Sequence, residues 1–395
     1  MNILVFTNLF PNQQQPHFGI FIKQRVAQYR NFGHRIRVLV PVSYFPLKRR
    51  LRGDFSFNGL KKEGNLDGID VTYFHYLHLP KIGMLLQPFL MLASALWVLR
   101  SLSKDFRPDL IDAHYLYPDG VTASFLSRIH RIPLVQSARG SDVNLILAFS
   151  IPRRMVLKAL SHSARIVTVS KQLKSILVKY GVESEKVAVI PNGVDPALFY
   201  MNKKIGRRRG SDFIKRVLMV GNLTRLKGQA LLLTALEGLQ AADLPARLHV
   251  FFIGSGPLAP LIRRKARLFS GHIRVRLVGP VPHHKLVNWF NHADALCLLS
   301  EMEGCPNVVL EALASGLPVL ATRVGDLEQL ITADNGVLVE RRNPSEIAET
   351  LVSVLERQWD RDAIADHGRR FGWRQMGAEV DAVFRSAASL SRRSS

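Results

Sequence analysis

The sequence predicts an α/β protein with two doubly wound parallel sheets, and three observations support this. Short runs rich in β-branched residues alternate with segments of helical periodicity, which is the pattern of βαβ units. The alternation pauses over residues 196–215 and then restarts. The length of 395 residues is enough for two domains that each bury a core, at roughly 100–200 residues per domain.

Seven strands are predicted in the first part of the chain. They cover residues 3–6, 36–40, 71–75, 110–113, 134–137, 166–169 and 187–190. Residues 196–215 are rich in Lys and Arg and poor in apolar residues, which is typical of a linker or a surface loop. We therefore expect a first domain over residues 1–195 and a second over residues 196–370.

Six further strands are predicted in the second part. They cover residues 217–220, 248–253, 274–278, 295–299, 318–321 and 337–339. Glycines stand at or soon after the ends of most of these strands, namely Gly221, Gly254, Gly256, Gly279, Gly304 and Gly325. In open parallel sheets, ligands bind beyond the carboxyl ends of the strands, at helix N-termini. We expect the chemistry of this protein at that edge.

Composition and charge narrow the class of protein. Apolar residues make up 47% and charged residues 22% of the chain, which favours a soluble globular protein. Cys297 and Cys305 are the two cysteines, which excludes a disulfide framework and a zinc-ligand set and fits a reducing, cytosolic compartment. The net charge of +23 favours an anionic partner: nucleic acid, an anionic membrane surface or a phosphorylated small molecule.

Two segments bear on targeting. The chain begins with an apolar, strand-like run, so we expect no secretion signal. The apolar stretch 82–99 is interrupted by Gln87 and Pro88, which favours a helix that is buried or grazes a membrane over one that spans it.

Residues 300–322, Ser-Glu-Met-Glu-Gly-Cys-Pro-Asn-Val-Val-Leu-Glu-Ala-Leu-Ala-Ser-Gly-Leu-Pro-Val-Leu-Ala-Thr, are the most informative stretch. Pro306 and Gly316 suit the two ends of a helix over 306–315. Glu303 would precede this helix and Glu311 would lie in its second turn, so that both can face one crevice. Backbone amides near 306–308 would meet an anion such as a diphosphate, and Gly304 lets a ligand approach the backbone. The alternative is a capped helix with two solvated glutamates.

The sequence resembles the family 4 retaining glycosyltransferases, the glycogen-synthase-like enzymes, and in particular a polysaccharide-building branch of them. Their Ser-x-x-Glu-Gly-x-Pro, Glu-x7-Glu and Ala-x-Gly-x-Pro-Val signature is matched without a gap over residues 300–319. Also matched are Pro-Asn-Gly-Val-Asp at 191–195, Gly221 with Lys227-Gly228, the loop 254–257 and Gly279. The resemblance implies the GT-B fold, with two Rossmann-like domains that face a deep cleft and a terminal helix, 371–395, that packs back on the first.

The resemblance also implies residue roles. Lys227 would neutralise the donor's diphosphate, Glu303 would hold hydroxyls of the donor sugar and Glu311 would accept from the ribose hydroxyls. Further donor contacts are expected at Gly19, Arg225, Gly254, Gly256, Gly279, Gly304, Cys305, Pro306 and Asn307. No metal or other cofactor is expected, because Lys227 and helix amides would stabilise the charge on the leaving diphosphate.

Some residues depart from the family pattern. Asn222 stands where the family usually has Arg, and we expect Arg225 to supply that charge. Arg139 replaces the histidine of a His-Gly-x-Asp-like turn, so its role is contact with a phosphate or an acceptor carboxylate, or a structural one. His114, just past the fourth parallel strand, is a candidate acceptor contact and joins Glu303 and Lys227 as a candidate catalytic residue, the alternative being a structural histidine.

These observations predict a glycosyltransferase of cell-surface polysaccharide biosynthesis. It would move a sugar from a nucleotide diphosphate sugar to a hydroxyl of a lipid-linked or polysaccharide acceptor. We expect a cytoplasmic enzyme, peripheral at the inner face of the membrane, that docks through residues 48–52 and 82–99 and a basic N-terminal face without Asp or Glu over residues 1–53.

Three alternatives stay open. They are a nucleotide-sugar epimerase of the same fold, a catalytically silent scaffold suggested by Asn222 and Arg139, and a nucleic-acid-binding protein suggested by the charge alone. The last lacks a recognition motif. Asp360-Arg-Asp362 is spelled like a metal-binding pair, but we interpret it as the cap of a late helix.

Overall fold

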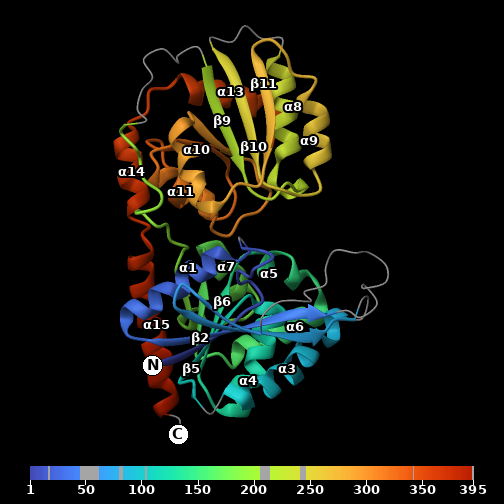
Figure 1. Ribbon diagram of the computed structural model, residues 1–395, viewed down its shortest axis with the longest axis vertical. Coiled ribbons are helices and arrows are strands. Elements are labelled where there is room, and N and C mark those ends of the chain that lie inside the picture. Colours follow the sequence, from blue (N-terminus) through green and yellow to red (C-terminus); the bar gives the residue numbers. More distant parts are fainter. Residues whose placement is uncertain are drawn as a thin grey trace. The chain divides into compact units, whose positions relative to one another are not determined.

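The computed structural model describes residues 1–16, 18–44, 62–79, 83–102, 105–204, 214–240, 246–340 and 342–393. The chain divides into two compact units (Figure 1). Unit 1 is Met1–Asn192 together with Trp373–Ser395, and unit 2 is Gly193–Gly372. Each unit is a parallel-sheet α/β domain, which confirms the predicted fold class.

Unit 1 contains an eight-stranded sheet in the order β3-β4-β2-β1-β5-β6-β7-β8. The strands are β1 (Asn2–Phe6), β2 (Arg35–Tyr44), β3 (Glu63–Leu66), β4 (Ile69–Leu77), β5 (Leu110–His114), β6 (Leu134–Ala138), β7 (Arg165–Thr168) and β8 (Val187–Val189). All seven predicted strands are present. The prediction missed β3, an exposed edge strand that pairs antiparallel with β4 through a turn at Asp67 and Gly68, both with positive φ.

Helices cover both faces of this sheet. They are α1 (Ile20–Tyr29), α3 (Gly83–Leu102), α4 (Val121–His130), α5 (Ser141–Asn144), α6 (Ser150–Ser161), α7 (Lys171–Lys179) and α15 (Trp373–Arg393). Alternate residues of β1 enter two different cores: Ile3 and Val5 pack with α1 and α15, whereas Leu4 and Phe6 pack with α3 and α4. Strands buried on both faces explain the continuous apolar runs in the sequence.

The apolar stretch predicted as a helix is α3, and Gln87 and Pro88 do not interrupt it, because the helix continues through Pro88. Pro88 has no N–H to bond the carbonyl of Met84, a residue that is 40% exposed. The Pro88 carbonyl accepts from Thr122 Oγ1 at 3.1 Å, which ties α3 to α4. Residues 84–102 are long and apolar enough to cross a membrane by length and composition alone, and a third of this window is buried in the protein.

Unit 2 contains a six-stranded, fully parallel sheet in the order β11-β10-β9-β12-β13-β14. The strands are β9 (Ile214–Val220), β10 (Arg247–Ile253), β11 (Ile273–Gly279), β12 (Ala295–Leu298), β13 (Val319–Thr322) and β14 (Gly336–Val339), so all six predicted strands are present. The chain reverses its direction across the sheet between β9 and β12. This is a topological switch point, where open α/β sheets bind ligands.

The helices of unit 2 are α8 (Gln229–Leu239), α9 (Ala259–Ala266), α10 (Leu286–His292), α11 (Asn307–Ala314), α12 (Leu327–Leu330), α13 (Pro344–Glu356) and α14 (Arg361–Arg369). One core lies under α8, α9 and α13, and another lies under α10 and α11. The helix predicted over 306–315 is α11, with Pro306 one position before its first residue and Gly316 just past its end.

The Asp360-Arg-Asp362 sequence caps a helix, as predicted. The Asp360 carboxylate accepts from the backbone N–H of Ala363 at 3.0 Å, at the start of α14. Asp362 forms an ion pair of 2.8 Å with Lys203. Among the residues that the structure describes, no group of three or more His, Cys, Asp or Glu is placed to hold a metal ion.

Candidate functional site

In unit 2, the loops that follow β9 and β10 lie against each other at the carboxyl edge of the sheet. A Cβ added at Gly254 would lie 2.0 Å from the carbonyl oxygen of Gly221, and one added at Gly256 would lie 2.5 Å from that of Leu223. The N–H of Leu223 donates to the Ser255 carbonyl at 2.9 Å, and the N–H of Gly254 donates to Gly279 at 2.9 Å. Glycine at 254 and 256 thus allows the two loops to pack closely at this edge, where a side chain would meet the neighbouring backbone.

Lys227 and Glu303 meet at this edge. Lys227 ends the short 3-10 turn Arg225–Lys227 after β9, and its Nζ donates to Glu303 Oε1 at 2.5 Å. Ser300 Oγ donates to the same oxygen at 2.6 Å. Glu303 is 8% exposed, and its Oε2 has no partner among the described residues. One carboxylate oxygen is therefore fixed by the protein, and the other is available to accept from a ligand.

The backbone around Glu303 is fixed by neighbouring loops. The N–H of Glu301 donates to the Leu226 carbonyl at 2.8 Å, and Thr322 Oγ1 donates to the Ser300 carbonyl at 2.7 Å. Ser300 as the partner of Glu303 was not predicted from the sequence. The signal was its position in the Ser-x-x-Glu spacing, which matches the i, i+3 bond seen here.

Glu311 is held by a histidine that the sequence analysis missed. His283 Nε2 lies 2.7 Å from Glu311 Oε1, and the His283 ring packs edge-on against Phe199 with centroids 5.0 Å apart. Glu311 is 6% exposed. Both glutamates are therefore buried and bonded, and the alternative of two solvated glutamates is wrong.

The N-terminal end of α11 lies next to Glu303. Gly304 and Cys305 lead into this helix, and Pro306 is buried at its N-cap. The N–H groups of Asn307 and Val308 bond to no described residue, and Asn307 Oδ1 is buried without a described partner. These groups form the donor-rich helix terminus that the sequence predicted for an anion.

The side chain of Arg225 forms no hydrogen bond or ion pair with these groups among the described residues. Arg225 occupies the same 3-10 turn as Lys227, but its side chain is exposed and bonds to no described residue. The structure thus brings together Lys227, Glu303 and the start of α11, whereas a phosphate contact for Arg225 stays a prediction.

Unit 1 contains a separate buried polar network. Tyr29 Oη donates to Asp112 Oδ2 at 2.7 Å, and Arg25 Nε donates to Tyr29 Oη at 3.2 Å. His114 Nε2 lies 3.0 Å from Asp112 Oδ2. Arg25, Tyr29, Asp112 and His114 are each at most 2% exposed. Both Nη atoms of Arg25 are buried without a described partner.

Arg139 completes this network. Its guanidinium contacts His114 Nδ1 and donates to Asn192 Oδ1 at 3.2 Å. Because a guanidinium only donates, Nδ1 of His114 accepts and the ring proton is on Nε2, which faces Asp112. Burial lowers the pKa of His114 to about 4. The Asp112 carboxylate acts to raise this pKa, and the Arg139 charge acts to lower it. The imidazole is therefore neutral at pH 7.

Two predicted residues of unit 1 are placed as follows. Gly19 is the N-cap of α1 with φ 66°, and a Cβ there would lie 2.2 Å from the Leu9 carbonyl oxygen. His114 is fully buried at the end of β5, so in this structure it contacts Arg139 and Asp112 instead of the surface. Ligand contacts of Gly19 and His114 stay predictions.

Comparisons with known proteins place both units in one enzyme family. Residues 19–198 match the family described as Glycosyltransferase Family 4, and residues 214–357 match the family described as Glycosyl transferases group 1. A relative from Bacillus subtilis, named as the teichuronic acid biosynthesis glycosyltransferase TuaC, is 31% identical, with 93% of this chain and 92% of the relative covered. A D-inositol 3-phosphate glycosyltransferase of Corynebacterium glutamicum is 28% identical, over 71% of this chain and 72% of the relative.

Solved structures share the fold. HepE of Anabaena, in complex with UDP and glucose, has a TM-score of 0.72 at 20% identity, covering 98% of this chain and 100% of that one. Sucrose-phosphate synthase of Thermosynechococcus elongatus has a TM-score of 0.74 at 17% identity, covering 98% and 99%. The chain therefore belongs to glycosyltransferase family 4 and is a glycosyltransferase of the GT-B fold.

Proposed function

We propose that this glycosyltransferase moves a sugar, with retention at the anomeric carbon, from a nucleotide diphosphate sugar to a hydroxyl of a lipid-linked or polysaccharide acceptor. The carrying observation is the Lys227–Glu303 pair beside the start of α11, at the switch point of the unit 2 sheet. The solved structures of HepE contain UDP or UDP-glucose, which supports a nucleotide-sugar donor. The name of TuaC refers to teichuronic acid biosynthesis, which supports a polysaccharide product.

The donor would be bound by groups of unit 2. Lys227 and the amides of Asn307 and Val308 would meet the diphosphate, since an ammonium and helix N–H groups both favour an anion. Glu303 Oε2 would accept from hydroxyls of the transferred sugar, and Glu311 Oε2 would accept from the ribose. In each glutamate, the other oxygen is held by the protein, so the carboxylate is oriented before the donor binds.

Transfer requires that the bond between the anomeric carbon and the diphosphate oxygen breaks, with its electron pair going to the leaving diphosphate. Lys227 and the α11 amides would stabilise that developing charge. The acceptor oxygen would bond to the anomeric carbon on the same face, and its proton would pass to the departing phosphate oxygen. The alternative route to retention uses a carboxylate nucleophile. The resemblance to family 4 enzymes favours the first route.

Unit 1 would contact the acceptor. Arg25 is buried and Arg139 is half-buried. The two guanidinium charges repel each other, whereas the Asp112 carboxylate attracts both, and an unpaired buried charge is costly. An anionic group of the acceptor, phosphate or carboxylate, would compensate Arg139. His114 then acts as a positioning residue, because its Nδ1 holds the guanidinium.

We also propose that the enzyme works in the cytoplasm, peripherally at the inner membrane face. The helix α3 exposes five large apolar side chains: Met84, Leu85, Leu86, Phe89 and Trp97. With a net charge of +23, attraction to anionic lipid adds up to about 1 kcal/mol per cation near the surface. Residues 48–52, also predicted to dock, lie outside the described residues. Flotation with anionic and neutral vesicles tests this proposal. Recovery of the protein with anionic vesicles that equals its recovery in the absence of vesicles would contradict it.

The donor is tested by thermal shift and hydrolysis with UDP- and GDP-sugars, followed by NMR of the product's anomeric signal. We expect a selective shift and slow donor hydrolysis, both weakened in Glu303→Ala. The matched control is Glu237→Ala, which removes a glutamate of the same unit that is paired with Lys265 on the surface. Unchanged turnover in Glu303→Ala, or inversion at the anomeric carbon, would contradict the proposed mechanism.

A further inference from the structure

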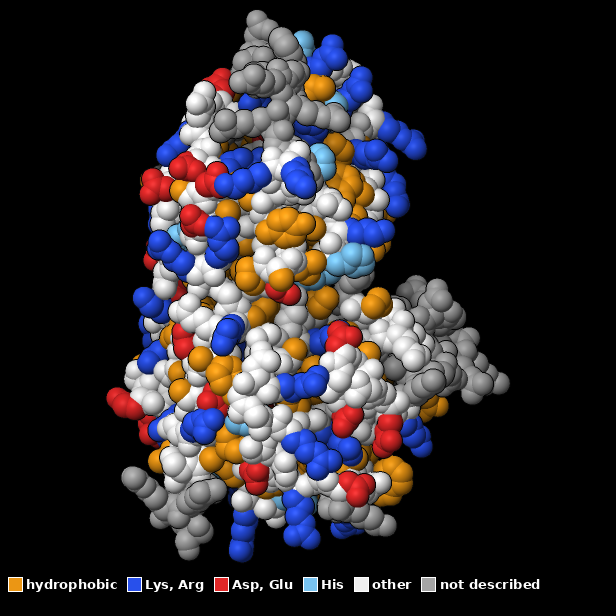
Figure 2. Space-filling view, turned by 60° about the vertical axis from the view of Figure 1, so that its left-hand side comes forward, with side chains coloured by type: hydrophobic (Ala, Val, Ile, Leu, Met, Phe, Trp, Pro, Cys, Tyr) orange, Lys and Arg blue, Asp and Glu red, His pale blue; other side chains and the backbone are white. Residues whose placement is uncertain are grey.

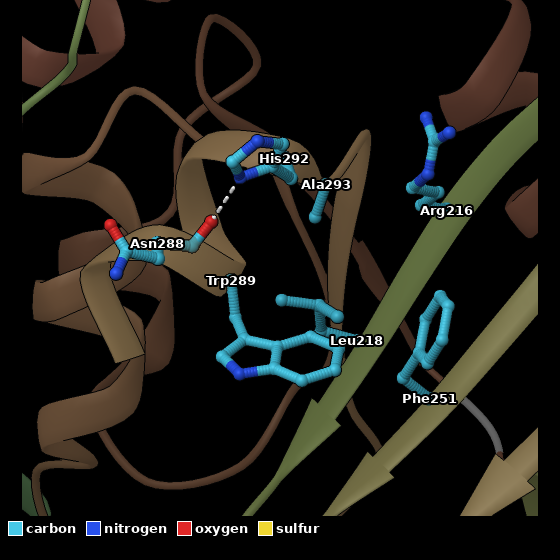
Figure 3. Close-up of a pocket in the computed structure, with 7 residues that line it drawn as sticks. All are labelled: Arg216, Leu218, Phe251, Asn288, Trp289, His292 and Ala293. Carbon is cyan, nitrogen blue, oxygen red and sulfur yellow. Dashed lines mark hydrogen bonds between the residues drawn. The ribbon is translucent and has the colours of Figure 1, made fainter. Parts of the chain in front are cut away.

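Unit 2 contains a pocket between α10 and the strands β9 and β10, separate from the donor site. It has a volume of about 320 Å³ and is lined by Arg216, Leu218, Phe251, Asn288, Trp289, His292 and Ala293. Figure 3 shows Trp289, Leu218 and Phe251 on one side of the pocket, and His292, Ala293 and Arg216 on the other. None of these residues belongs to the donor site described above. The volume lies at the lower end of the range of small-molecule sites, about 300–1,000 Å³.

The apolar part of the pocket contains two aromatic rings. Phe251 and Trp289 contact each other edge to face, with centroids 5.4 Å apart and planes at 62°. Both are half-buried, while Leu218 and Ala293 beside them are at most 2% exposed. Half-buried rings over a buried aliphatic base can pack against the face or edge of another ring.

The face of the sheet that lines the pocket is basic. In the strand register, His249 of β10 pairs with Arg274 of β11 on one side and Arg216 of β9 on the other, so the three side chains form a row on one face. Arg276 is the partner of Phe251 in the next row on that face. Burial lowers the pKa of His249, and the charges of Arg274 and Arg216 add to the effect, which is consistent with a positive local field.

Arg216 makes no side-chain hydrogen bond or ion pair with any residue that the structure describes, although it is half-buried. The described lining residues include no Asp or Glu. The nearby Asp294 carboxylate accepts from the backbone N–H of Arg216 at 2.6 Å, and the charges of Lys215, Arg361 and Arg216 all act on it, so it is not paired with Arg216 alone. Figure 2 shows Lys and Arg side chains beside hydrophobic ones on the face of the molecule that it presents.

We propose that this pocket binds a small aromatic anion, with the ring packed on Phe251 and Trp289 and a phosphate, sulfonate or carboxylate held by Arg216. A guanidinium pairs with all three anions through parallel N–H bonds, and the row of Arg274 and His249 adds to the attraction. A neutral ring would satisfy the aromatic part alone, and a ringless anion the basic part alone.

The probe is 1-anilinonaphthalene-8-sulfonate, an aromatic sulfonate whose fluorescence rises in apolar surroundings. Titration of the full-length protein is expected to show a saturable site that weakens about tenfold in Arg216→Gln and in Trp289→Leu. The matched control is Arg263→Gln, which removes an exposed guanidinium from α9 on the opposite face of the same sheet and is expected to change nothing. Circular dichroism and thermal melting establish whether each variant is folded. If Arg216→Gln does not fold, Trp289→Leu serves as the test.

Two further measurements locate the probe. The neutral analogue N-phenyl-1-naphthylamine is expected to bind more weakly and with equal affinity in Arg216→Gln. The Lys227→Ala variant, which changes the donor site, is expected to retain sulfonate binding. Equal weakening in Arg216→Gln and Arg263→Gln would show a general charge effect, and unchanged affinity in both pocket variants would place the probe elsewhere. Loss of binding in Lys227→Ala would place it in the donor site, and each of these three results would overturn the proposal.

Discussion

Lys227 Nζ lies 2.5 Å from Glu303 Oε1 although the two residues are 76 positions apart. One follows β9 and the other follows β12, the neighbouring strands at the switch point of the unit 2 sheet. In the proposed function this ion pair joins the group that meets the diphosphate to the group that meets the sugar. The energetics of the pair can therefore be read out in donor binding and in turnover.

We expect Lys227→Gln to lower kcat/KM for the donor by roughly 100-fold or more, the usual range for loss of a charge-stabilising group. The reason is that the developing charge on the leaving diphosphate loses its nearest cation. Steady-state kinetics of transfer or donor hydrolysis measure this.

The matched control is Lys265→Gln, because Lys265 forms an ion pair of 2.7 Å with Glu237 between α9 and α8, away from the strand ends. Pairs with partly exposed partners contribute little, about 0–1 kcal/mol, so activity should be retained. Equal activity of the two variants would refute the role of Lys227.

We expect His283→Ala to raise the donor KM about tenfold or more with a smaller change in kcat, and His283→Gln to restore part of the loss. His283 orients Glu311 at 2.7 Å, and a hydrogen bond to a charged group is worth about 1.5–3 kcal/mol. Donor titrations separate KM from kcat. The neighbouring His284, which is exposed, provides the control substitution His284→Ala. A KM that responds to both substitutions alike would argue against orientation of Glu311.

We expect Gly254→Ala to destabilise unit 2 by about 1–3 kcal/mol and to abolish donor binding. The added Cβ would lie 2.0 Å from the Gly221 carbonyl oxygen, and the φ of 138° disfavours any side chain. Thermal melting with and without the donor measures both effects. Gly238→Ala within α8 has open space around it and should stabilise by about 0.5–1 kcal/mol. A Gly254→Ala variant that melts like the wild type would contradict the close approach of the two loops.

The strands could be predicted because parallel strands buried on both faces have continuous β-branched runs. The strand β3 could not, because Glu63–Leu66 is an exposed edge strand whose sequence lacks such a run. In the site, the helix α11 followed from Pro306 and Gly316, which act locally on the backbone. The partner of Glu311 did not, because His283 lies 28 residues earlier and reaches it only through the folding of β12 and α11.

The buried network of unit 1 illustrates the same limit. The sequence marked His114 and Arg139 separately, but their contact depends on the pairing of β5 with β6, which places the ends of these strands side by side. Burial of the histidine, which sets its charge, is also a property of the folded unit.

That burial predicts a pH dependence of stability. The pKa of His114 is about 4 in the folded protein against 6.5 ordinarily, so between these values the unfolded chain binds a proton that the folded protein does not. The free energy of unfolding therefore falls as the pH decreases from about 6.5 to 4, by about 3 kcal/mol in all at about 1.36 kcal/mol per pKa unit. Roughly 2 kcal/mol of this loss falls between pH 7 and pH 5. Urea unfolding at the two pH values should show a smaller difference in His114→Gln than in the wild type, whereas His130→Gln, at an exposed position, should leave the difference unchanged. An equal pH dependence in His114→Gln and the wild type would mean that His114 is not held neutral.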